Sequence, residues 1–188
     1  MALSRTFDEI MTRRPNLSKR TVQTTVLIVG EGDTEKAFLD YLKSLYVTRG
    51  CGVSVTIRNA HGKGPINVVD TAIRQSRTGE YKVVAVLMDT DLLWTDNVIK
   101  LARKHRICLI GATPCADGLL LQILGEQAPE QSPRCKEALH ARMNRKPFVK
   151  EAYAQDFPKQ LLDEKSMGIP ALKKLLELMA GLSPDSDR

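Results

Sequence analysis

Four short apolar runs recur along the chain, and each is followed by a segment with the periodicity of an amphipathic helix. The runs cover residues 24–30, 53–57, 82–88 and 107–110. In the segments between them, apolar residues recur at spacings of three and four, which is typical of helices that bury one face. Strands that alternate with helices of about 10–15 residues predict a parallel sheet with right-handed crossovers. The sequence therefore predicts an α/β fold: a doubly wound, mainly parallel, four-stranded, Rossmann-like sheet with helices on both faces.

Details of the pattern predict how individual elements are buried and where they begin. Thr24 to Gly30 are nearly all apolar or β-branched, as expected of a strand that is buried on both faces. Val53 to Ile57 alternate strictly, which predicts a half-buried strand. Asp33 or Thr34 is expected to cap the first helix. A later helix is expected over Trp94–Arg106.

The alternation of strands and helices stops after residue 126, where Pro129 and Pro133 interrupt the chain. We therefore divide the sequence into a basic N-terminal arm, an α/β core and a helical C-terminal extension packed on that core, at residues 1–23, 24–126 and 127–188. The extension is predicted to hold a basic helix over Cys135–Arg145 and an amphipathic helix from about Pro170. The arm is interpreted as loosely docked, and either a solvated tail or a contact with phosphates accounts for its charge.

The composition favours polyanionic partners. The 188 residues carry a formal net charge of +6, and the isoelectric point lies near 9.2, so nucleic acid is a natural partner through its phosphates. The four cysteines form no Cys-x-x-Cys pair and histidine is rare, which argues against a zinc site. No apolar run is long enough to span a bilayer, and the N-terminus lacks the apolar stretch of a secretory signal. A cytoplasmic location is therefore expected.

Acidic residues follow two of the predicted strands. Glu31 comes directly after the first strand, and Asp89 and Asp91 come after the third. Because the carboxyl ends of parallel strands meet at one edge of the sheet, where open α/β folds bind ligands, we expect these acids to lie together. Clustered carboxylates suit Mg²⁺, which prefers oxygen ligands. The alternative is a surface acid at Glu31 and a helix cap at Asp89-Thr90-Asp91.

The segment Glu31-Gly32-Asp33-Thr34-Glu35, together with Asp89-Thr90-Asp91, resembles the motifs of the Toprim domain. That domain is shared by topoisomerases, bacterial primases, some ribonucleases and the nucleases of the OLD family. The resemblance is closer to the small RloB-like and OLD-type Toprim proteins of prokaryotic defence and mobile elements, whose first motif is an apolar strand followed by Glu-Gly-x-Thr-Glu. It covers roughly residues 24–125.

The resemblance implies roles for five acids. Glu31 would bind metal or act as a general acid or base, and Asp89 and Asp91 would coordinate Mg²⁺ or Mn²⁺. Glu35 would be a further metal ligand, although a first-turn acid that favours the helix dipole accounts for it equally well. Asp117 stands in a segment that resembles the Pro-Cys-Phe-Glu of RloB-like proteins, with Asp in place of the longer Glu. It would complete the metal site or only cap the next helix.

Two basic features are candidate phosphate contacts. Gly62-Lys63-Gly64 follows the second strand and is similar to a loop of RloB-like proteins. Lys63 would contact a phosphate while the glycines allow close approach; a flexible turn is the plain alternative, and the spacing is not that of a P-loop. Three cations of the extension would follow a nucleic-acid backbone or form a solvated helix face: Arg142, Arg145 and Lys146.

Two functions remain open from the sequence. The first is a Mg²⁺- or Mn²⁺-dependent phosphodiesterase, a nuclease on DNA or RNA, which the family resemblance would place in phage defence or a mobile-element system. The second is a non-catalytic module that binds nucleic acid or protein as a subunit of a larger complex. The chain has no ATPase signature, so ATP-driven regulation would require a partner ATPase. A phosphoaspartyl receiver domain fits poorly, because only Glu31 follows the first strand, where that fold needs an acid pair.

Overall fold

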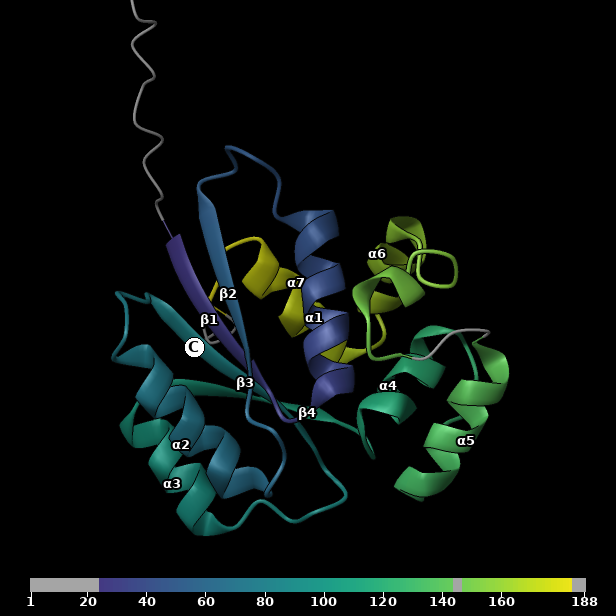
Figure 1. The fold of residues 1–188 in the computed structure, drawn as a ribbon, viewed down its shortest axis with the longest axis horizontal. Coiled ribbons are helices and arrows are strands. Elements are labelled where there is room, and N and C mark those ends of the chain that lie inside the picture. The colour runs from purple at the N-terminus through teal and green to yellow at the C-terminus, as the bar shows by residue number, and fades with distance from the viewer. Residues whose placement is uncertain (1–23, 144–146, 184–188) are drawn as a thin grey trace, which may run out of the picture.

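A parallel sheet of four strands forms the centre of the protein (Figure 1). The computed structural model describes residues 24–143 and 147–183. The strands lie in the order β2-β1-β3-β4, and all neighbouring pairs are parallel. Their bounds are Thr24–Gly30 for β1, Val53–Asn59 for β2, Val83–Asp89 for β3 and Ile107–Ala112 for β4. The predicted α/β class, with its doubly wound parallel sheet, is therefore confirmed.

Helices cover both faces of this sheet. Their bounds are Asp33–Tyr46 for α1, Pro65–Ser76 for α2, Asp96–Lys104 for α3, Ala116–Ile123 for α4, Ser132–Arg142 for α5, Lys159–Ser166 for α6 and Pro170–Met179 for α7, with a 3-10 turn, η2, at Lys150–Ala152. Helices α2 and α3 lie side by side on one face (Figure 1). Helices α1, α4 and α7 pack on the other face, where α5 and α6 contact α4 and η2 contacts α1.

The central strand β1 is buried from both sides. Val26 and Ile28 belong to the apolar cluster under α1, whereas Leu27 and Val29 belong to the cluster under α2 and α3. All four side chains are fully buried, because each face of the strand has a helical layer over it. Strand β2 lies at the edge of the sheet and alternates between buried and exposed positions. Both burial patterns agree with those predicted from the sequence.

The C-terminal helical segment shares a core with α1. Tyr153 and Phe157 are fully buried, and their rings pack against the ring of Phe38 at centroid distances of 5.4 and 6.0 Å. The hydroxyl of Tyr41 donates a hydrogen bond to the backbone oxygen of Phe157 at 2.7 Å. Apolar packing therefore attaches residues 147–183 to the α1 side of the sheet.

The cap of α1 differs from the prediction. Neither Asp33 nor Thr34 is the N-cap; that position is taken by Gly32. The Oε2 atom of Glu35 accepts a hydrogen bond from the backbone N–H of Gly32 at 3.0 Å. This is the carboxylate half of a capping box, in which the glycine contributes no side chain.

The bounds of two further helices were predicted wrongly. Helix α3 begins at Asp96 rather than at Trp94, because Thr95 is its N-cap and accepts from the backbone N–H of Val98 at 3.4 Å. The indole N–H of Trp94 instead donates to the backbone oxygen of Asp89 at 3.0 Å. Helix α5 spans residues 132–142 rather than 135–145, and α6 was not predicted at all.

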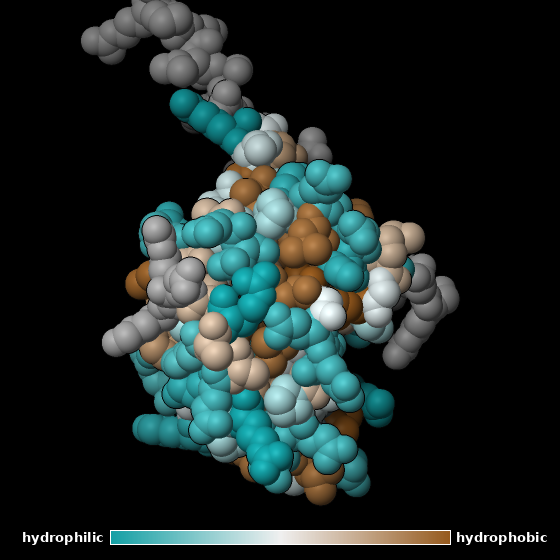
Figure 2. Space-filling model, turned by 90° about the vertical axis from the view of Figure 1, so that its right-hand side faces the viewer, coloured by the Kyte–Doolittle hydropathy of each residue, from teal (hydrophilic) through white to brown (hydrophobic). Residues whose placement is uncertain are grey.

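The surface is mostly hydrophilic when it is viewed from the side of α5 and α6, apart from a narrow band of hydrophobic residues (Figure 2). Within residues 24–143 and 147–183, no helix is both long enough and apolar enough to cross a membrane. Among the described residues, the most exposed large apolar side chains are Leu93 and Met167, at 91% and 87% exposure. Isolated exposed residues of this kind are ordinary on folded proteins.

Candidate active site

The strand order reverses between β1 and β3. Helix α1 follows β1 on one face of the sheet, whereas α2 leads into β3 from the other face (Figure 1). Open α/β sheets bind ligands in the crevice at such a switch point, outside the carboxyl ends of the strands. Glu31 directly follows β1, and Asp89 is the last residue of β3. The fold therefore places both predicted acids at the switch point.

Glu31 connects the ends of these two strands. Its backbone N–H donates to the backbone oxygen of Leu87 at 3.1 Å, and its Oε2 atom accepts from the backbone N–H of Asp89 at 3.2 Å. Burial raises the pKa of the Glu31 carboxyl group, the Asp89 N–H lowers it, and the charge of Asp91 raises it further. A partly buried carboxyl group with a raised pKa suits general acid or base chemistry.

Glu35 lies in the first turn of α1, four positions after Glu31, and is only 5% exposed. Its carboxyl group caps α1 through Gly32 and also lies in hydrogen-bonding contact with the carboxyl group of Asp89. Burial raises the pKa of Glu35, and the charge of Glu31 adds to that effect, while hydrogen bonds oppose it. The capping role thus accounts for one contact of Glu35, and the contact with Asp89 is the one that fits a metal ligand.

Asp89 is the centre of the group. Its Oδ1 atom accepts a hydrogen bond from the backbone N–H of Ala116, in the first turn of α4, at 2.9 Å. Burial raises the pKa of Asp89 to about 8, and the charges of Glu35 and Glu31 contribute to the rise. Ionising this side chain beside its neighbours is therefore unfavourable unless positive charge is supplied.

We define the carboxylate cluster as Glu31, Glu35 and Asp89. In the described part of the chain, none of the three forms an ion pair with a lysine, arginine or histidine. The carboxyl groups of Glu35 and Asp89 are close enough to share a proton. The charge of the cluster is thus balanced by bound protons or by a cation from solution, because no protein cation does so.

Asp91 and Asp117 lie at the margins of the cluster. Asp91 is exposed, and its Oδ2 atom accepts from the hydroxyl of Ser132 at 2.6 Å. Asp117 has a buried Oδ1 atom without a hydrogen-bond partner; burial raises its pKa, whereas His140 and Lys136 of α5 lower it. Asp117 therefore lies close enough to α5 for its cations to act on it. It is not the cap of α4, which begins after Cys115, and its role as a metal ligand stays a prediction.

Among the described residues, no three or more His, Cys, Asp and Glu side chains are already gathered as a group that could hold a metal ion. Each member of the carboxylate cluster has an oxygen atom that accepts a backbone N–H. The set of donor atoms, all of them carboxylate oxygens, nevertheless has the chemistry that a hard divalent cation requires.

The Gly62-Lys63-Gly64 loop lies beside the end of β1. Residues 61–64 all have positive φ angles, between 59° and 81°. The backbone N–H of Gly62 donates to the backbone oxygen of Glu31 at 2.8 Å, and the side chain of Asn67 donates to the backbone oxygen of Gly62 at 2.7 Å. The loop is thus attached to Glu31 at the end of β1. The side chain of Lys63 is exposed.

Arg142, one of the three predicted cations of the extension, is not brought to this site. Arg142 forms ion pairs with Glu126 at 3.0 Å and with Asp156 at 3.5 Å, so its guanidinium connects α5 to the loop after α4 and to the segment after η2. It lies at the opposite end of α5 from Ser132, about 15 Å away at the usual rise of a helix. Arg145 and Lys146 fall outside the described residues.

Ser132 and Ala116 are contacts of the acids that the sequence did not single out. The hydroxyl of Ser132 reaches Asp91 across 41 positions of the chain, and the backbone N–H of Ala116 reaches Asp89 across 27. A serine before a proline and an alanine after a cysteine carry no signal of such contacts in the sequence. Only the packing of α4 on the sheet and of α5 on α4 brings them there.

The turn between β1 and α1 leaves no space for a side chain at Gly30. A Cβ atom there would lie 2.8 Å from the Cβ of Glu35 and 3.1 Å from the backbone nitrogen of Lys36. We expect Gly30→Ala to lower the free energy of unfolding by about 1–3 kcal/mol, the usual cost of overpacking, as measured by urea denaturation. Gly168→Ala is the matched control, since nothing lies within 4 Å of its added Cβ. Equal losses in the two variants would contradict the prediction.

The raised pKa values predict how pH affects the metal-free protein. The folded state keeps protons on the cluster up to the pKa of Asp89, about 8, whereas the unfolded chain releases them near pH 4. Protons therefore stabilise the folded state fully below about pH 4, and this contribution is lost as the pH rises toward about 8. We expect the free energy of unfolding in EDTA to fall over this range more steeply in the native chain than in Asp89→Asn. Parallel pH profiles in urea denaturation would show the expectation to be wrong.

Comparisons with known proteins produced no match. No family model, no curated protein and no solved structure matches the chain. The resemblance to Toprim proteins therefore rests on the sequence motifs and stays a prediction. Any functional conclusion has to come from the geometry and chemistry of the carboxylate cluster and of the surface around it.

Proposed function

We propose that the protein is a Mg²⁺- or Mn²⁺-dependent phosphodiesterase of the Toprim type that cleaves DNA or RNA. One observation carries the proposal: Glu35 contacts Asp89 beside Glu31, at the switch point of the sheet, and no basic side chain is paired with any of them in the described residues. The Toprim-like spacing of these acids and the basic composition of the chain support the same conclusion.

The donor set fits a hard divalent cation. Glu31, Glu35 and Asp89 would hold it, with Asp91 at the exposed margin of the site. A bound Mg²⁺ or Mn²⁺ would supply Lewis acidity toward a phosphodiester and a water of lowered pKa. Burial raises the pKa values of all three groups and neighbouring carboxylate charges add to the rise, so a bound cation would favour their ionised forms.

The residues of the chain have separable tasks in this proposal. Glu31, with its raised pKa, is the group suited to accept or return a proton. The backbone N–H groups of Ala116 and Gly32 orient the carboxylates of Asp89 and Glu35. Since the elements that supply these donors are the first turns of α4 and α1, the orientation is set by rigid parts of the fold.

A non-catalytic binding module is the second candidate function. The observation that favours it is that each carboxylate of the cluster already accepts a backbone N–H, so the acids contribute to the structure without any metal. In that case the cluster would connect α1, α4 and the two central strands, and the protein would bind nucleic acid or a partner protein without cleaving it.

Cleavage assays test the proposed function. Labelled single-stranded DNA, double-stranded DNA and tRNA are incubated with the protein in Mg²⁺, in Mn²⁺ and in EDTA. We expect strand cleavage in one or both metals and none in EDTA. A second readout, independent of turnover, is the melting temperature: binding to the folded state alone raises it, so Mn²⁺ should stabilise the native chain and should stabilise Asp89→Asn much less.

Absence of cleavage from protein that binds these substrates and is stabilised by Mn²⁺ would overturn the phosphodiesterase proposal in favour of the binding module. Absence of any stabilisation by divalent cations, at concentrations up to several millimolar, would remove the metal centre itself. Asp96→Asn is a matched control for the metal measurements, because Asp96 is an exposed acid in the first turn of α3 and is not part of the cluster.

A further inference from the structure

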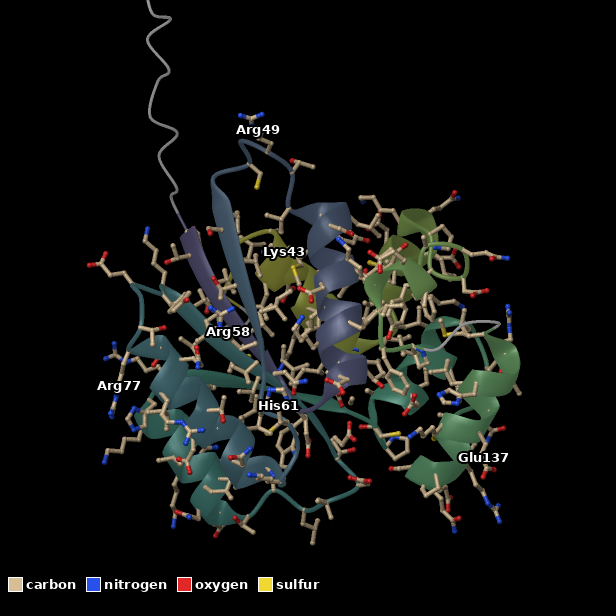
Figure 3. The ribbon with its side chains drawn as sticks, viewed as in Figure 1. Lys43, Arg49, Arg58, His61, Arg77 and Glu137 are labelled. Atoms are coloured by element: carbon tan, nitrogen blue, oxygen red, sulfur yellow. The ribbon has the colours of Figure 1, made fainter. Side chains whose placement is uncertain are left out.

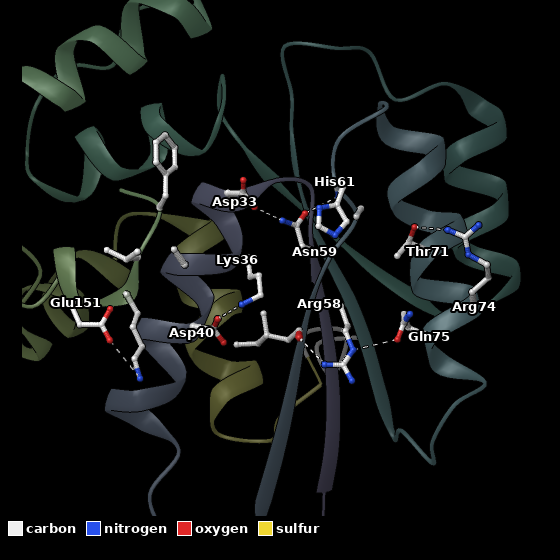
Figure 4. Close-up of a pocket in the computed structure, with 16 residues that line it drawn as sticks. Asp33, Lys36, Asp40, Arg58, Asn59, His61, Thr71, Arg74, Gln75 and Glu151 are labelled. Atoms are coloured by element: carbon white, nitrogen blue, oxygen red, sulfur yellow. Dashed lines mark hydrogen bonds and ion pairs between the residues drawn. The ribbon is translucent and has the colours of Figure 1, made fainter. Parts of the chain in front are cut away.

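A groove of about 870 Å³ runs along the outer edge of β2. Its walls come from α1 on one side, from α2 on the other and from the segment of residues 148–151 (Figure 4). No member of the carboxylate cluster lines it. The edge of a sheet with a groove of this size beside it is a surface on which an extended ligand can lie.

The charges that line the groove are not balanced evenly. Lys36 is paired with Asp40 at 2.6 Å, and Lys150 with Glu151 at 3.9 Å (Figure 4). Asp33, the remaining acid of the lining, accepts a hydrogen bond from the side chain of Asn59 at 2.7 Å. Asn59 is neutral, so Asp33 keeps its charge, but the four cations of the lining still outnumber its three acids, and the two arginines are the cations that no carboxylate pairs.

Arg58 and Arg74 have no carboxylate partner among the described residues. Arg58 donates to the side-chain oxygen of Gln75 and to the backbone oxygen of Ile57, both at 3.3 Å. Arg74 donates to the hydroxyl of Thr71 at 2.9 Å. A guanidinium group has five N–H donors, so both side chains are held in place by neutral acceptors and keep donors and full charge for an anion.

The groove reaches the candidate active site at one end. Asp33 and His61 line it. Each is next in sequence to a glycine, Gly32 or Gly62, that contacts a residue of the carboxylate cluster. Gly32 donates its N–H to Glu35, and Gly62 donates its N–H to the backbone oxygen of Glu31 at 2.8 Å. A chain that lies along β2 with its phosphates on the arginines therefore arrives at the carboxyl end of β1.

We propose that this groove binds the phosphate backbone of a single-stranded nucleic acid and leads it to the carboxylate cluster. The direction of the strand rests on the proposed function, whereas the binding itself does not. Guanidinium groups match phosphate geometry with paired donors. Phe148 and Val149, which are 41% and 55% exposed, give the same groove an apolar wall on which a base can stack.

An extended peptide is the competing occupant, because β2 is an edge strand and edge strands accept further strands. The guanidinium of Arg58 opposes this, since it already donates to the backbone oxygen of Ile57 at 3.3 Å. A peptide that paired with β2 at this point would have to displace that contact and cover an unpaired charge. A polyanion leaves the contact in place and uses the charge.

The test is the binding of fluorescein-labelled 12-residue oligo-dT and oligo-U in EDTA, where no metal-dependent reaction takes place. Arg58→Gln/Arg74→Gln removes the two groove charges. The matched control is Arg49→Gln/Arg77→Gln, which removes two exposed arginines that point away from the protein outside the groove (Figure 3). We expect the groove variant to bind about tenfold more weakly or worse, and the slope of log K against log salt to fall by about 1.4, the value for two phosphate contacts on a single strand.

A second measurement locates the bound strand. Oligonucleotides that carry 5-iodouracil are irradiated with the native protein, and cross-linked peptides are identified by mass spectrometry. We expect a cross-link at Phe148 that is lost in Phe148→Leu. Melting temperatures of all variants are compared first. If the double variant does not fold, Arg74→Lys, which keeps the charge but not the paired donors, replaces it in the binding measurement.

The outcomes separate this inference from the proposed function. Equal affinities of the groove and control variants, or a cross-link that maps away from residues 57–61 and 147–151, would overturn the groove proposal even if the protein cleaves nucleic acid. Binding of an extended peptide that excludes the oligonucleotide from the groove would overturn it as well. Weakened binding in the groove variant, in a protein that never cleaves with any cation, would support the groove and reject the phosphodiesterase.

Discussion

Asp89→Asn is expected to reduce metal-dependent cleavage by about 10²–10³-fold, the loss typical when one group that stabilises transition-state charge is removed. The reason is positional: Asp89 contacts Glu35, lies beside Glu31 and is oriented by the N–H of Ala116. The shape of the side chain is kept, so packing is preserved while the charge is removed. Single-turnover cleavage of a labelled oligonucleotide in Mg²⁺ measures the effect.

The same substitution is expected to make the metal-free protein more stable at about pH 8. In the native chain, ionising the buried Asp89 beside Glu35 is unfavourable, and this raises its pKa to about 8. An amide at this position carries no charge, so the variant avoids the free-energy cost of burying a carboxylate. A gain in stability with a loss of activity is the pattern of a functional site rather than of a structural one. Asp96→Asn, at an exposed acid of α3, should change neither quantity. Unchanged cleavage in Asp89→Asn would remove Asp89 from the reaction.

Phe157→Ala is expected to lower the free energy of unfolding by about 3–5 kcal/mol, the usual cost of removing a buried aromatic ring. Phe157 is fully buried, and its ring lies 6.0 Å from that of Phe38 and 5.5 Å from that of Tyr153. Its removal leaves a cavity between the C-terminal segment and α1. Urea denaturation monitored by circular dichroism measures the change.

Phe148→Ala is the matched control, because the same atoms are removed from a side chain that is 41% exposed. Its ring has an edge contact with His140, at 6.1 Å between centroids, and lies under the ammonium group of Lys136 at 6.0 Å; both contacts are at the surface, so we expect a loss of less than about 1 kcal/mol. If Phe157→Ala cost as little as Phe148→Ala, the C-terminal helices would be attached to the core more weakly than the packing of their aromatic rings indicates.

The fold could be predicted because hydrophobic periodicity depends on how many faces of an element are covered. Residues 24–30 are almost uniformly apolar because helices cover both faces of β1, and residues 53–57 alternate because β2 lies at the edge. The ends of helices were predicted less well. Trp94 fits a helical pattern, but Thr95 is the N-cap of α3, and the indole N–H of Trp94 donates to the backbone oxygen of Asp89, five positions earlier, so Trp94 lies before the helix.

The candidate site was predicted in part, for a related reason. Parallel strands have their carboxyl ends at one edge, so acids that follow β1 and β3 have to lie near each other once the strands are neighbours. The sequence cannot state which acid faces which. The contact between Glu35 and Asp89, and the closeness of Asp117 to the cations of α5, depend on the packing of α1, α4 and α5.

The order of the elements, the parallel sheet and the position of Glu31 and Asp89 at its edge could be predicted from the sequence, since they follow from local periodicity and from the rules that connect strands and helices. Contacts between residues that no local pattern relates became known only from the folded structure. Arg58 on an edge strand and Arg74 on a helix become lining residues of one groove, and the backbone N–H of Ala116 becomes the partner of Asp89. Such contacts depend on how layers pack, and packing is a property of the whole chain.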